Sequence, residues 1–155
     1  MKLGDVLKKE RERKRLTVDD VAKRLRLEPD RYQEIEAGGS PAEEWGPRMA
    51  TIAIKLQTPT SRLIAESGKA ADAGRVDGQC GHLIAAHREK RGFSVQQLAE
   101  MIDVPMPQMV SIENGDSPLE TYGPLLLAFA EVINQPIFNL FYPCGLPLNE
   151  LTDYP

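Results

Sequence analysis

The sequence is poor in cysteine and has no long apolar segment, and both absences restrict what the protein can be. Only two of its 155 residues are cysteines, Cys80 and Cys144, which is too few for a disulfide framework. The longest apolar run, residues 124–130, is far shorter than the roughly 20 residues that a transmembrane helix needs. The N-terminus is charged and has no apolar core of the kind that export signals have. We therefore expect a cytoplasmic protein with no membrane segment.

Residues for catalysis or metal binding are also scarce. The two histidines, His82 and His87, occur without a nucleophile in any spacing typical of a catalytic site. Together with the two cysteines they match no common zinc-ligand spacing. Free thiols are expected, and a redox-switched disulfide stays open as an alternative. The sequence thus predicts no enzyme, no metal and no cofactor.

Lysine and arginine are scarce in the second half of the chain. Residues 70–155 contain 4 Lys and Arg against 11 Asp and Glu, whereas residues 1–69 contain 15 against 12. The net charge of −4 and the pI near 5.3 therefore combine a basic first part with an acidic second part. A polyanion such as DNA is attracted to the first part and repelled by the second.

What the sequence does contain is a pattern of two short helices joined by a tight turn, in the stretch TVDDVAKRLRLEPDRYQEIEAG from Thr17 to Gly38. Thr17 is a good N-cap, and the aspartates that follow favour the first turn of a helix. Ala22 is small enough to let a second helix cross closely. Pro29 suits the first turn of the next helix, and Gly38 suits its end. This pattern predicts a helix-turn-helix.

The same pattern recurs 77 residues later, in SVQQLAEMIDVPMPQMVSIENG from Ser94 to Gly115. The register continues without a gap from the pair Leu3/Cys80 to the pair Leu63/Leu140. Identical residues occupy the pairs Gly4/Gly81, Arg11/Arg88, Glu12/Glu89, Val18/Val95, Ala22/Ala99, Ile35/Ile112, Glu36/Glu113, Gly38/Gly115, Pro41/Pro118, Gly46/Gly123, Pro47/Pro124 and Pro59/Pro136. We interpret the chain as a tandem duplication of one unit.

Apolar periodicity, caps and prolines predict five helices in each unit and no strand. The expected helices are Gly4–Arg15, Thr17–Arg24, Pro29–Ala37, Pro47–Leu56 and Pro59–Glu66, then Gly81–Lys90, Val95–Met101, Pro105–Asn114, Pro124–Ile133 and Pro136–Phe141. The expected core positions are Leu7, Val21, Ala22, Leu25, Ile35, Ile52 and Leu56, matched by Ile84, Leu98, Ala99, Ile102, Ile112, Phe129 and Ile133. The predicted fold is all-α, with two tandem five-helix domains at 1–66 and 80–142, a linker at 67–79 and an extended tail at 143–155.

These residues resemble the lambda-repressor-like, or XRE-family, helix-turn-helix domains over both units. The resemblance rests on LTVDDVAKRLRL and YQEIEAG in the first unit and on FSVQQLAEMIDV and MVSIENGDSP in the second. In that family the third helix enters the major groove, the start of the second meets a phosphate, and dimers read two half-sites. The resemblance implies a DNA-binding transcriptional regulator that acts as a dimer through its first helix-turn-helix, on a palindromic site in double-stranded DNA.

By position, the resemblance implies DNA contacts from Pro29, Asp30, Arg31, Gln33 and Glu34 in the third helix and from Thr17 and Val18 at the start of the second. The dense basic charge of the first helix, beside such a pattern, adds Arg11 and Lys14 as expected phosphate contacts. Arg31 suits guanine and Gln33 suits adenine, whereas the two carboxylates accept from cytosine or repel phosphates. Val18 and Pro29 depart from the family, which often has Gln at the first position and a polar residue at the second.

The second unit has no Lys or Arg near its third helix and more apolar residues than a small domain needs to bury. The candidate residues for a dimer or partner interface are Met106, Met109, Leu125, Phe138, Phe141, Tyr142, Leu146 and Leu148. We expect a homodimer built mainly from the second unit, with the first unit left free for DNA. The alternatives are that this surface holds a different protein or covers the first unit.

The first unit is also similar to the helix-turn-helix domain of the bacterial cytoskeletal protein RodZ, in the segments ERERKRLTVDDVAKRLRL and DRYQEIEAG. That domain binds a filament protein instead of DNA. A protein-interaction module of this type is therefore the alternative function. The basic juxtamembrane stretch and membrane helix that accompany the RodZ domain are not found in this sequence.

Overall fold

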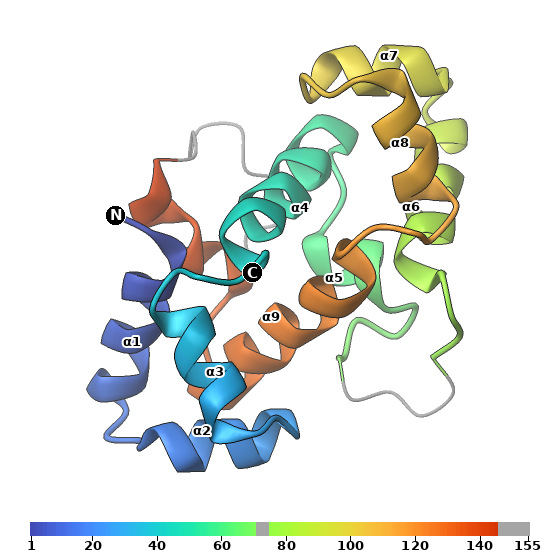
Figure 1. Cartoon of the computed structure of the whole chain (residues 1–155). Helices are drawn as coiled ribbons and strands as arrows, with labels where there is room; N and C mark the ends of the chain where they lie inside the picture. Colours follow the sequence, from blue (N-terminus) through green and yellow to red (C-terminus); the bar gives the residue numbers. More distant parts are fainter. Residues whose placement is uncertain (71–74, 146–155) are drawn as a thin grey trace.

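A computed structural model describes residues 1–70 and 75–145, and within these ranges the chain forms helices and no strand (Figure 1). The first half contains α1 (Leu3–Arg13), α2 (Val18–Leu25), α3 (Pro29–Glu36), α4 (Ala42–Leu56) and α5 (Thr60–Ile64). The second half contains α6 (Gln79–Lys90), α7 (Val95–Met101), α8 (Met106–Glu113), α9 (Leu119–Ile133) and two 3₁₀ helices, η1 (Ile137–Leu140) and η2 (Tyr142–Cys144). The predicted all-α fold is confirmed.

The starts of α2 and α7 show how one local pattern produces the same structure twice. The hydroxyl of Thr17 accepts from the amide of Asp20 at 3.0 Å, and the hydroxyl of Ser94 accepts from the amide of Gln97 at 3.0 Å. Each bond satisfies an amide that the first turn of a helix leaves without a backbone partner. In both cases the third helical residue also accepts from the amide of the cap, which completes a capping box.

Both long helices begin earlier than predicted. α4 starts at Ala42 and α9 at Leu119, so Pro47 and Pro124 lie inside these helices and not at their starts. A glycine precedes each proline, and because it has no Cβ it relieves the clash that disfavours helical backbone before proline. The Gly-Pro pair therefore lets a helix continue where proline alone predicts a boundary. The helix predicted at 136–141 is the shorter 3₁₀ helix η1.

The last helices of each half contact the other half as well as their own. α4 and α9 lie against each other through the middle of the molecule (Figure 1). α9 also contacts α2, η1 contacts α1, and α5 packs on α6. Among the described residues the first half has five helices and the second half has four α-helices and two 3₁₀ helices, but the two sets do not pack as two separate domains. The helices of both halves therefore surround one core.

A ring stack and two side-chain hydrogen bonds join the two halves. The ring of Tyr32 on α3 stacks on that of Phe129 on α9, with 6.3 Å between their centroids. Arg91, at the end of α6, donates to the backbone carbonyl of Gln57 at 2.8 Å and to the hydroxyl of Thr58 at 3.1 Å. Apolar residues of both halves accordingly form one hydrophobic cluster.

The predicted core is buried as expected, except that Leu25 is half-buried. The shared core also contains three residues predicted at a homodimer interface, Met109, Phe138 and Phe141, which are 0%, 2% and 0% exposed. That part of the prediction is wrong, because their apolar side chains are buried inside a single chain. Of the remaining candidates, Met106 and Tyr142 are exposed, Leu125 is half-buried, and Leu146 and Leu148 lie outside the described residues. The predicted extended tail begins inside η2, and its residues 146–155 also lie outside the described residues.

Candidate nucleic-acid interface

α3 presents polar side chains to solvent at the positions predicted to read DNA. Tyr32 and Ile35, which are 0% and 3% exposed, hold the helix against the core. The exposed residues of this helix are Pro29, Asp30, Arg31, Gln33 and Glu34. This follows from the helical period, because burial of positions 32 and 35 turns their neighbours outward. Arg31 and Gln33 are therefore both accessible to a partner.

The start of α2 is closed by a cap in which Thr17 and Asp20 bond to each other. Besides the cap bond, the amide of Thr17 donates to Oδ2 of Asp20 at 2.8 Å. This backbone hydrogen bond, and a second one from the Thr17 hydroxyl to the same carboxyl, lower the pKa of the Asp20 carboxyl below its ordinary value. Thr17 itself is exposed, but its hydroxyl is engaged with Asp20 within the cap. Val18 is half-buried and offers no hydrogen bond.

A hollow of about 320 Å³ lies where α1, α2 and α3 meet. Its lining residues are Lys8, Arg11, Val18, Gln33, Glu36 and Ala37. Lys8 is exposed and is absent from the predicted contacts. The helical period could have identified it, because it precedes Arg11 by three residues and therefore shares its face of α1. An anion in this hollow would meet the ammonium of Lys8 and the side-chain amide of Gln33.

Arg11 holds the first half together and is not available to DNA, contrary to the prediction. Its guanidinium donates to both carboxylate oxygens of Glu36, at 2.7 and 3.0 Å, and to the carbonyl of Leu16 at 2.9 Å. The bonds to Glu36 raise the pKa of Arg11 above its ordinary value, while burial opposes them. Only 9% of Arg11 is exposed. Lys14, by contrast, is exposed at the end of α1 and stays a candidate phosphate contact.

The second half repeats this internal bonding 77 residues later. Arg88 donates to both carboxylate oxygens of Glu113, at 2.8 and 2.9 Å, and to the carbonyl of Phe93 at 2.8 Å. Glu120 accepts from the amides of Cys80 and Gly81 at the start of α6, as Glu43 does from those of Leu3 and Gly4 at the start of α1. The scaffold that carries the third helix is therefore built from the same contacts in both halves.

The exposed face of α8 differs from that of α3 although the scaffolds match. The exposed residues at this face are Pro105, Met106, Pro107 and Val110. Val110 stands at the position of Gln33, and Gln108 at that of Arg31. From Gly92 to the C-terminus the chain has no Lys or Arg and eight Asp and Glu residues. The net negative charge of this part of the chain repels a polyanion.

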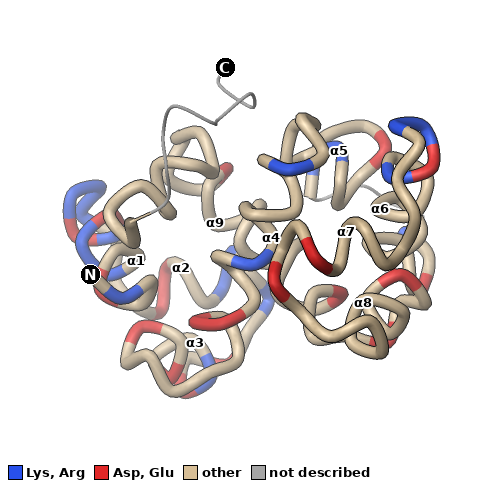
Figure 2. Tube along the Cα trace, turned by 90° about the horizontal axis from the view of Figure 1, so that it is seen from above, with Lys and Arg blue, Asp and Glu red and all other residues tan. Residues whose placement is uncertain are grey.

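Figure 2 shows α3 and α8 on the same side of the molecule, with basic segments on α1 and acidic segments, but no basic ones, on α7 and α8. One side of the protein thus carries a polar third helix next to basic residues and an apolar third helix among acidic ones.

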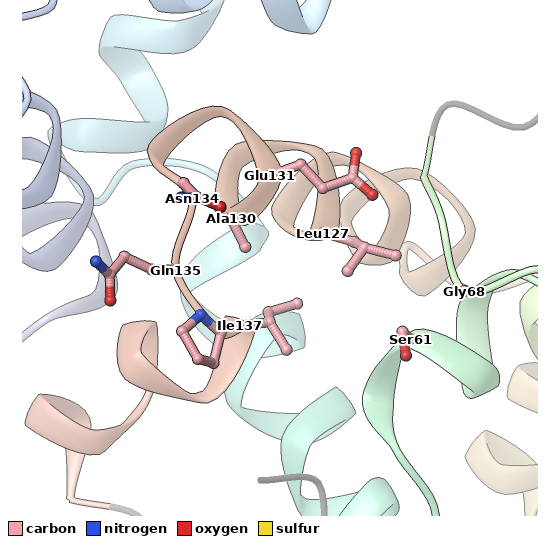
Figure 3. Close-up of a pocket in the computed structure, with 9 residues that line it drawn as sticks. Ser61, Gly68, Leu127, Ala130, Glu131, Asn134, Gln135 and Ile137 are labelled. Carbon is pink, nitrogen blue, oxygen red and sulfur yellow. The ribbon is translucent and has the colours of Figure 1, made fainter. Parts of the chain in front are cut away.

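A second hollow, of about 400 Å³, lies between α5 and the end of α9 (Figure 3). Leu127, Ala130 and Ile137 give it apolar walls, and Ser61 and Glu131 lie at its edge. Oε1 of Glu131 accepts from the amide of Ala70 at 2.9 Å. This hollow marks a junction between the two halves and gathers no pair of groups suited to acid–base or nucleophilic chemistry.

The described residues contain no group of three or more His, Cys, Asp or Glu placed to hold a metal ion. Cys80 and Cys144 are free thiols, and burial raises the pKa of the Cys80 thiol to about 12. Across the described part of the chain, no single helix is long and apolar enough to cross a membrane. α9 and residues 137–144 meet those criteria only together, with a bend of 99° between them.

Comparison with known proteins identifies the first half. The family model of a helix-turn-helix domain matches residues 2–52, which begin just before α1 and end within α4. No curated protein and no solved structure matches the chain. The first half therefore contains a helix-turn-helix domain, and the third helix of such a domain ordinarily enters the major groove of DNA.

Proposed function

We propose that this protein is a cytoplasmic, DNA-binding transcriptional regulator of the XRE type that contacts double-stranded DNA through α2 and α3. The observation that carries the proposal is the exposed polar face of α3, where Gln33 lines the same hollow as Lys8 of α1. Arg31 and Gln33 are accessible on α3, and Lys8 and Lys14 are accessible on α1. The positive net charge of this half supplies the attraction to phosphates that all DNA binding requires.

In this proposal the side chains divide into those that read bases and those that hold the backbone. The planar guanidinium of Arg31 can donate two bonds to guanine, and the amide of Gln33 can pair with adenine. Asp30 and Glu34 can only accept, so they favour cytosine and keep phosphates away from the centre of the helix. Lys14 and Lys8 would bind phosphates, whose position fixes the register of α3 in the groove.

We further propose that the second half is a second copy of the same helix-turn-helix unit, which keeps the scaffold and does not read DNA. The recurrence of caps, carboxylate–amide bonds and arginine bonds at a spacing of 77 residues supports this proposal. The apolar face of α8 and the absence of Lys and Arg beyond Arg91 support the loss of DNA contact.

The number of chains on one DNA site is part of the same proposal. The resemblance implies a homodimer on a palindromic site, but three of the eight residues assigned to its interface lie inside the shared core, so we assign the interface to no particular residues. Each chain has one polar third helix, so a palindrome would require two chains and a single half-site would require one. A palindromic bound sequence would therefore indicate two chains on each DNA site, and a single half-site would indicate one.

Selection of bound duplexes from random sequence by the full chain tests the proposal, and Arg31→Ala tests the site. We expect Arg31→Ala to cost about 1–3 kcal/mol of binding and to relax one base preference. The matched control is Gln108→Ala, at the equivalent position of α8, which should leave affinity and preference unchanged. Lys14→Ala should weaken binding to all DNA sequences alike, and the slope of log affinity against log salt concentration should fall by about 1. Failure of the full chain to bind any duplex at low salt would refute the proposal.

The alternative is a RodZ-like protein-interaction module that does not bind DNA. Val18 and Pro29, which replace polar residues common in DNA-binding members, favour it, as does the acidic second half. The two functions differ in one measurement, because only the regulator binds duplex DNA with an affinity that falls steeply as salt increases.

A further inference from the structure

We propose that the exposed face of α8 is a docking surface for a protein segment that has an apolar side flanked by lysine or arginine. This surface, the α8 surface below, consists of Pro105, Met106, Pro107 and Val110. The inference goes beyond DNA binding by the first half and does not depend on it, because it concerns a different helix and a different class of partner.

The α8 surface exposes large apolar side chains on a rigid support. Met106 and Val110 are 47% and 39% exposed and lie one helical turn apart. Beneath them Met109 and Ile112 are fully buried, and Glu113 fixes the end of the helix through its two bonds to Arg88. Because the helix is already ordered, a partner would find the surface formed before binding, which lowers the ordering cost of association. Methionine adapts well to irregular apolar partners.

Comparison with α3 indicates that the fold does not need apolar residues at these exposed positions. The positions of Met106, Pro107 and Val110 are occupied by Pro29, Asp30 and Gln33 in the first half. Both helices are carried by matching arginine–glutamate bonds, so the scaffold does not require apolar residues on the outside. A contiguous apolar patch with a polar border is the usual sign of an interaction site.

The charges around the α8 surface select the partner. Glu100, Asp103 and Asp116 are exposed before and after α8, and the chain has no Lys or Arg beyond Arg91 to balance them. Duplex DNA would be repelled. A second copy placed face to face would bring these three carboxylates against their counterparts, and like charges opposed across an interface are unfavourable. An amphipathic segment with basic residues satisfies both the apolar centre and the acidic border.

Fluorescence anisotropy with the full chain tests this inference directly. The probe is a labelled helical peptide with leucine on one face and lysine on the other, and the reference is the same peptide with glutamate in place of lysine. We expect the lysine peptide to bind and the glutamate peptide to bind at least about tenfold more weakly, a factor equivalent to 1.4 kcal/mol.

Two double variants separate the two features of the surface. Met106→Gln with Val110→Gln removes the apolar centre, and we expect a loss of lysine-peptide affinity of about tenfold, as for removal of an interface anchor. Asp103→Asn with Asp116→Asn removes charge from the border, and we expect weaker binding with a flatter salt dependence. Val76→Gln is the matched control, because Val76 is 62% exposed elsewhere on the chain. Circular dichroism establishes that each variant remains folded.

Four results would overturn the inference. The first is equal binding of the two peptides, and the second is an unchanged affinity in both double variants. The third is a full chain that sediments as a dimer and becomes a monomer in the Met106→Gln/Val110→Gln variant, which would make a second copy the occupant. The fourth is a change in the selected DNA sequence in that variant, which would assign the surface to nucleic acid. The DNA selection by α3 is scored separately, so failure of one proposal leaves the other measurable.

Discussion

At the scale of single residues, the two buried arginines decide how the third helices are held. Arg11 and Arg88 each join the first helix of a half to its third helix and to the loop before its second helix. A charge at such a site is tolerated because its partner carboxylate and a backbone carbonyl occupy its donors. Loss of the arginine would leave a buried carboxylate without compensation, and that is the costly case.

We therefore expect Arg11→Ala to lower the free energy of unfolding by about 3–5 kcal/mol, the usual loss when one partner of a buried pair is removed. Urea unfolding followed by circular dichroism measures this difference. Lys14→Ala, three residues further along the same basic segment but exposed, should change stability by less than about 0.5 kcal/mol. Equal stability of the two variants would contradict the structural role of Arg11.

His87 supplies a second prediction at this scale, concerning pH. Burial, followed by the nearby charges of Lys90 and Arg91, lowers the pKa of His87 below its ordinary value of 6.5. The unfolded chain therefore binds a proton at higher pH than the folded chain does. Stability from this group is complete above pH 6.5 and is lost as pH falls from there through the folded pKa.

We expect His87→Gln to show a smaller loss of stability than the parent between about pH 7 and about pH 5, the range in which histidine titrates. Thermal unfolding of the parent and the variant at a series of pH values measures how the stability of each changes with pH. His82→Gln, at an exposed position of the same helix, is the control and should follow the parent. Parallel curves for the parent and the His87 variant would show that burial of this imidazole does not affect stability.

At the scale of elements, the crossing of α4 and α9 makes equivalent glycines unequal. A Cβ on Gly46 would lie 2.8 Å from Leu3 Cδ2 and 3.0 Å from Leu126 Cδ1. At Gly123, the equivalent position of α9, the nearest atom would be Met49 Sδ at 3.4 Å, an ordinary contact. Both glycines precede a proline within a helix, so the local effects of an added methyl group are shared.

The comparison of Gly46→Ala with Gly123→Ala therefore isolates the tertiary crowding. We expect Gly46→Ala to be less stable than Gly123→Ala by about 1–3 kcal/mol, the usual cost of overpacking a core. Chemical denaturation of both variants gives the difference. If the two variants are equally stable, α4 does not approach Leu3 and α9 as closely as described.

At the scale of the whole molecule, the contacts between helices of the two halves make the halves interdependent. The second half supplies Phe129 and Phe141 to the surroundings of Tyr32 and Gly46, and the first half supplies α5 to cover α6. Cutting the chain between the halves would expose these apolar surfaces on both products. About 65 residues without a complete core is near the lower limit for independent folding.

We expect residues 1–72 and 73–155, prepared separately, to show no cooperative thermal transition as monomers, and an equimolar mixture to regain the transition of the whole chain. Circular dichroism and sedimentation measure both. A monomeric first fragment that unfolds cooperatively at the temperature of the whole chain would contradict the shared core. The same dependence explains why DNA binding has to be tested on the full chain.

The sequence by itself determined the helices, their caps and the positions that face inward. Thr17 and Ser94 cap helices because a hydroxyl beside free amides acts within a few residues, whatever the rest of the chain does. Burial of Tyr32 and exposure of Arg31 follow from the period of one helix. The contrast between a basic first half and an acidic second half is also a property of composition alone. These features depend on local geometry and charge, so they could be predicted.

Only the tertiary structure decided against which helices of the two halves each helix packs. An apolar face predicts that a helix is buried but not which helices cover it. Because the two halves follow the same pattern, α9 could pack in nearly the same way against either of them. For that reason Phe138 and Phe141 could be mistaken for a dimer interface. Arg11 could be mistaken for a phosphate contact because its partner Glu36 is 25 residues away in the sequence. The length of α4 and α9 resolves the ambiguity, because a 15-residue helix spans about 22 Å and so reaches from its own half into the other.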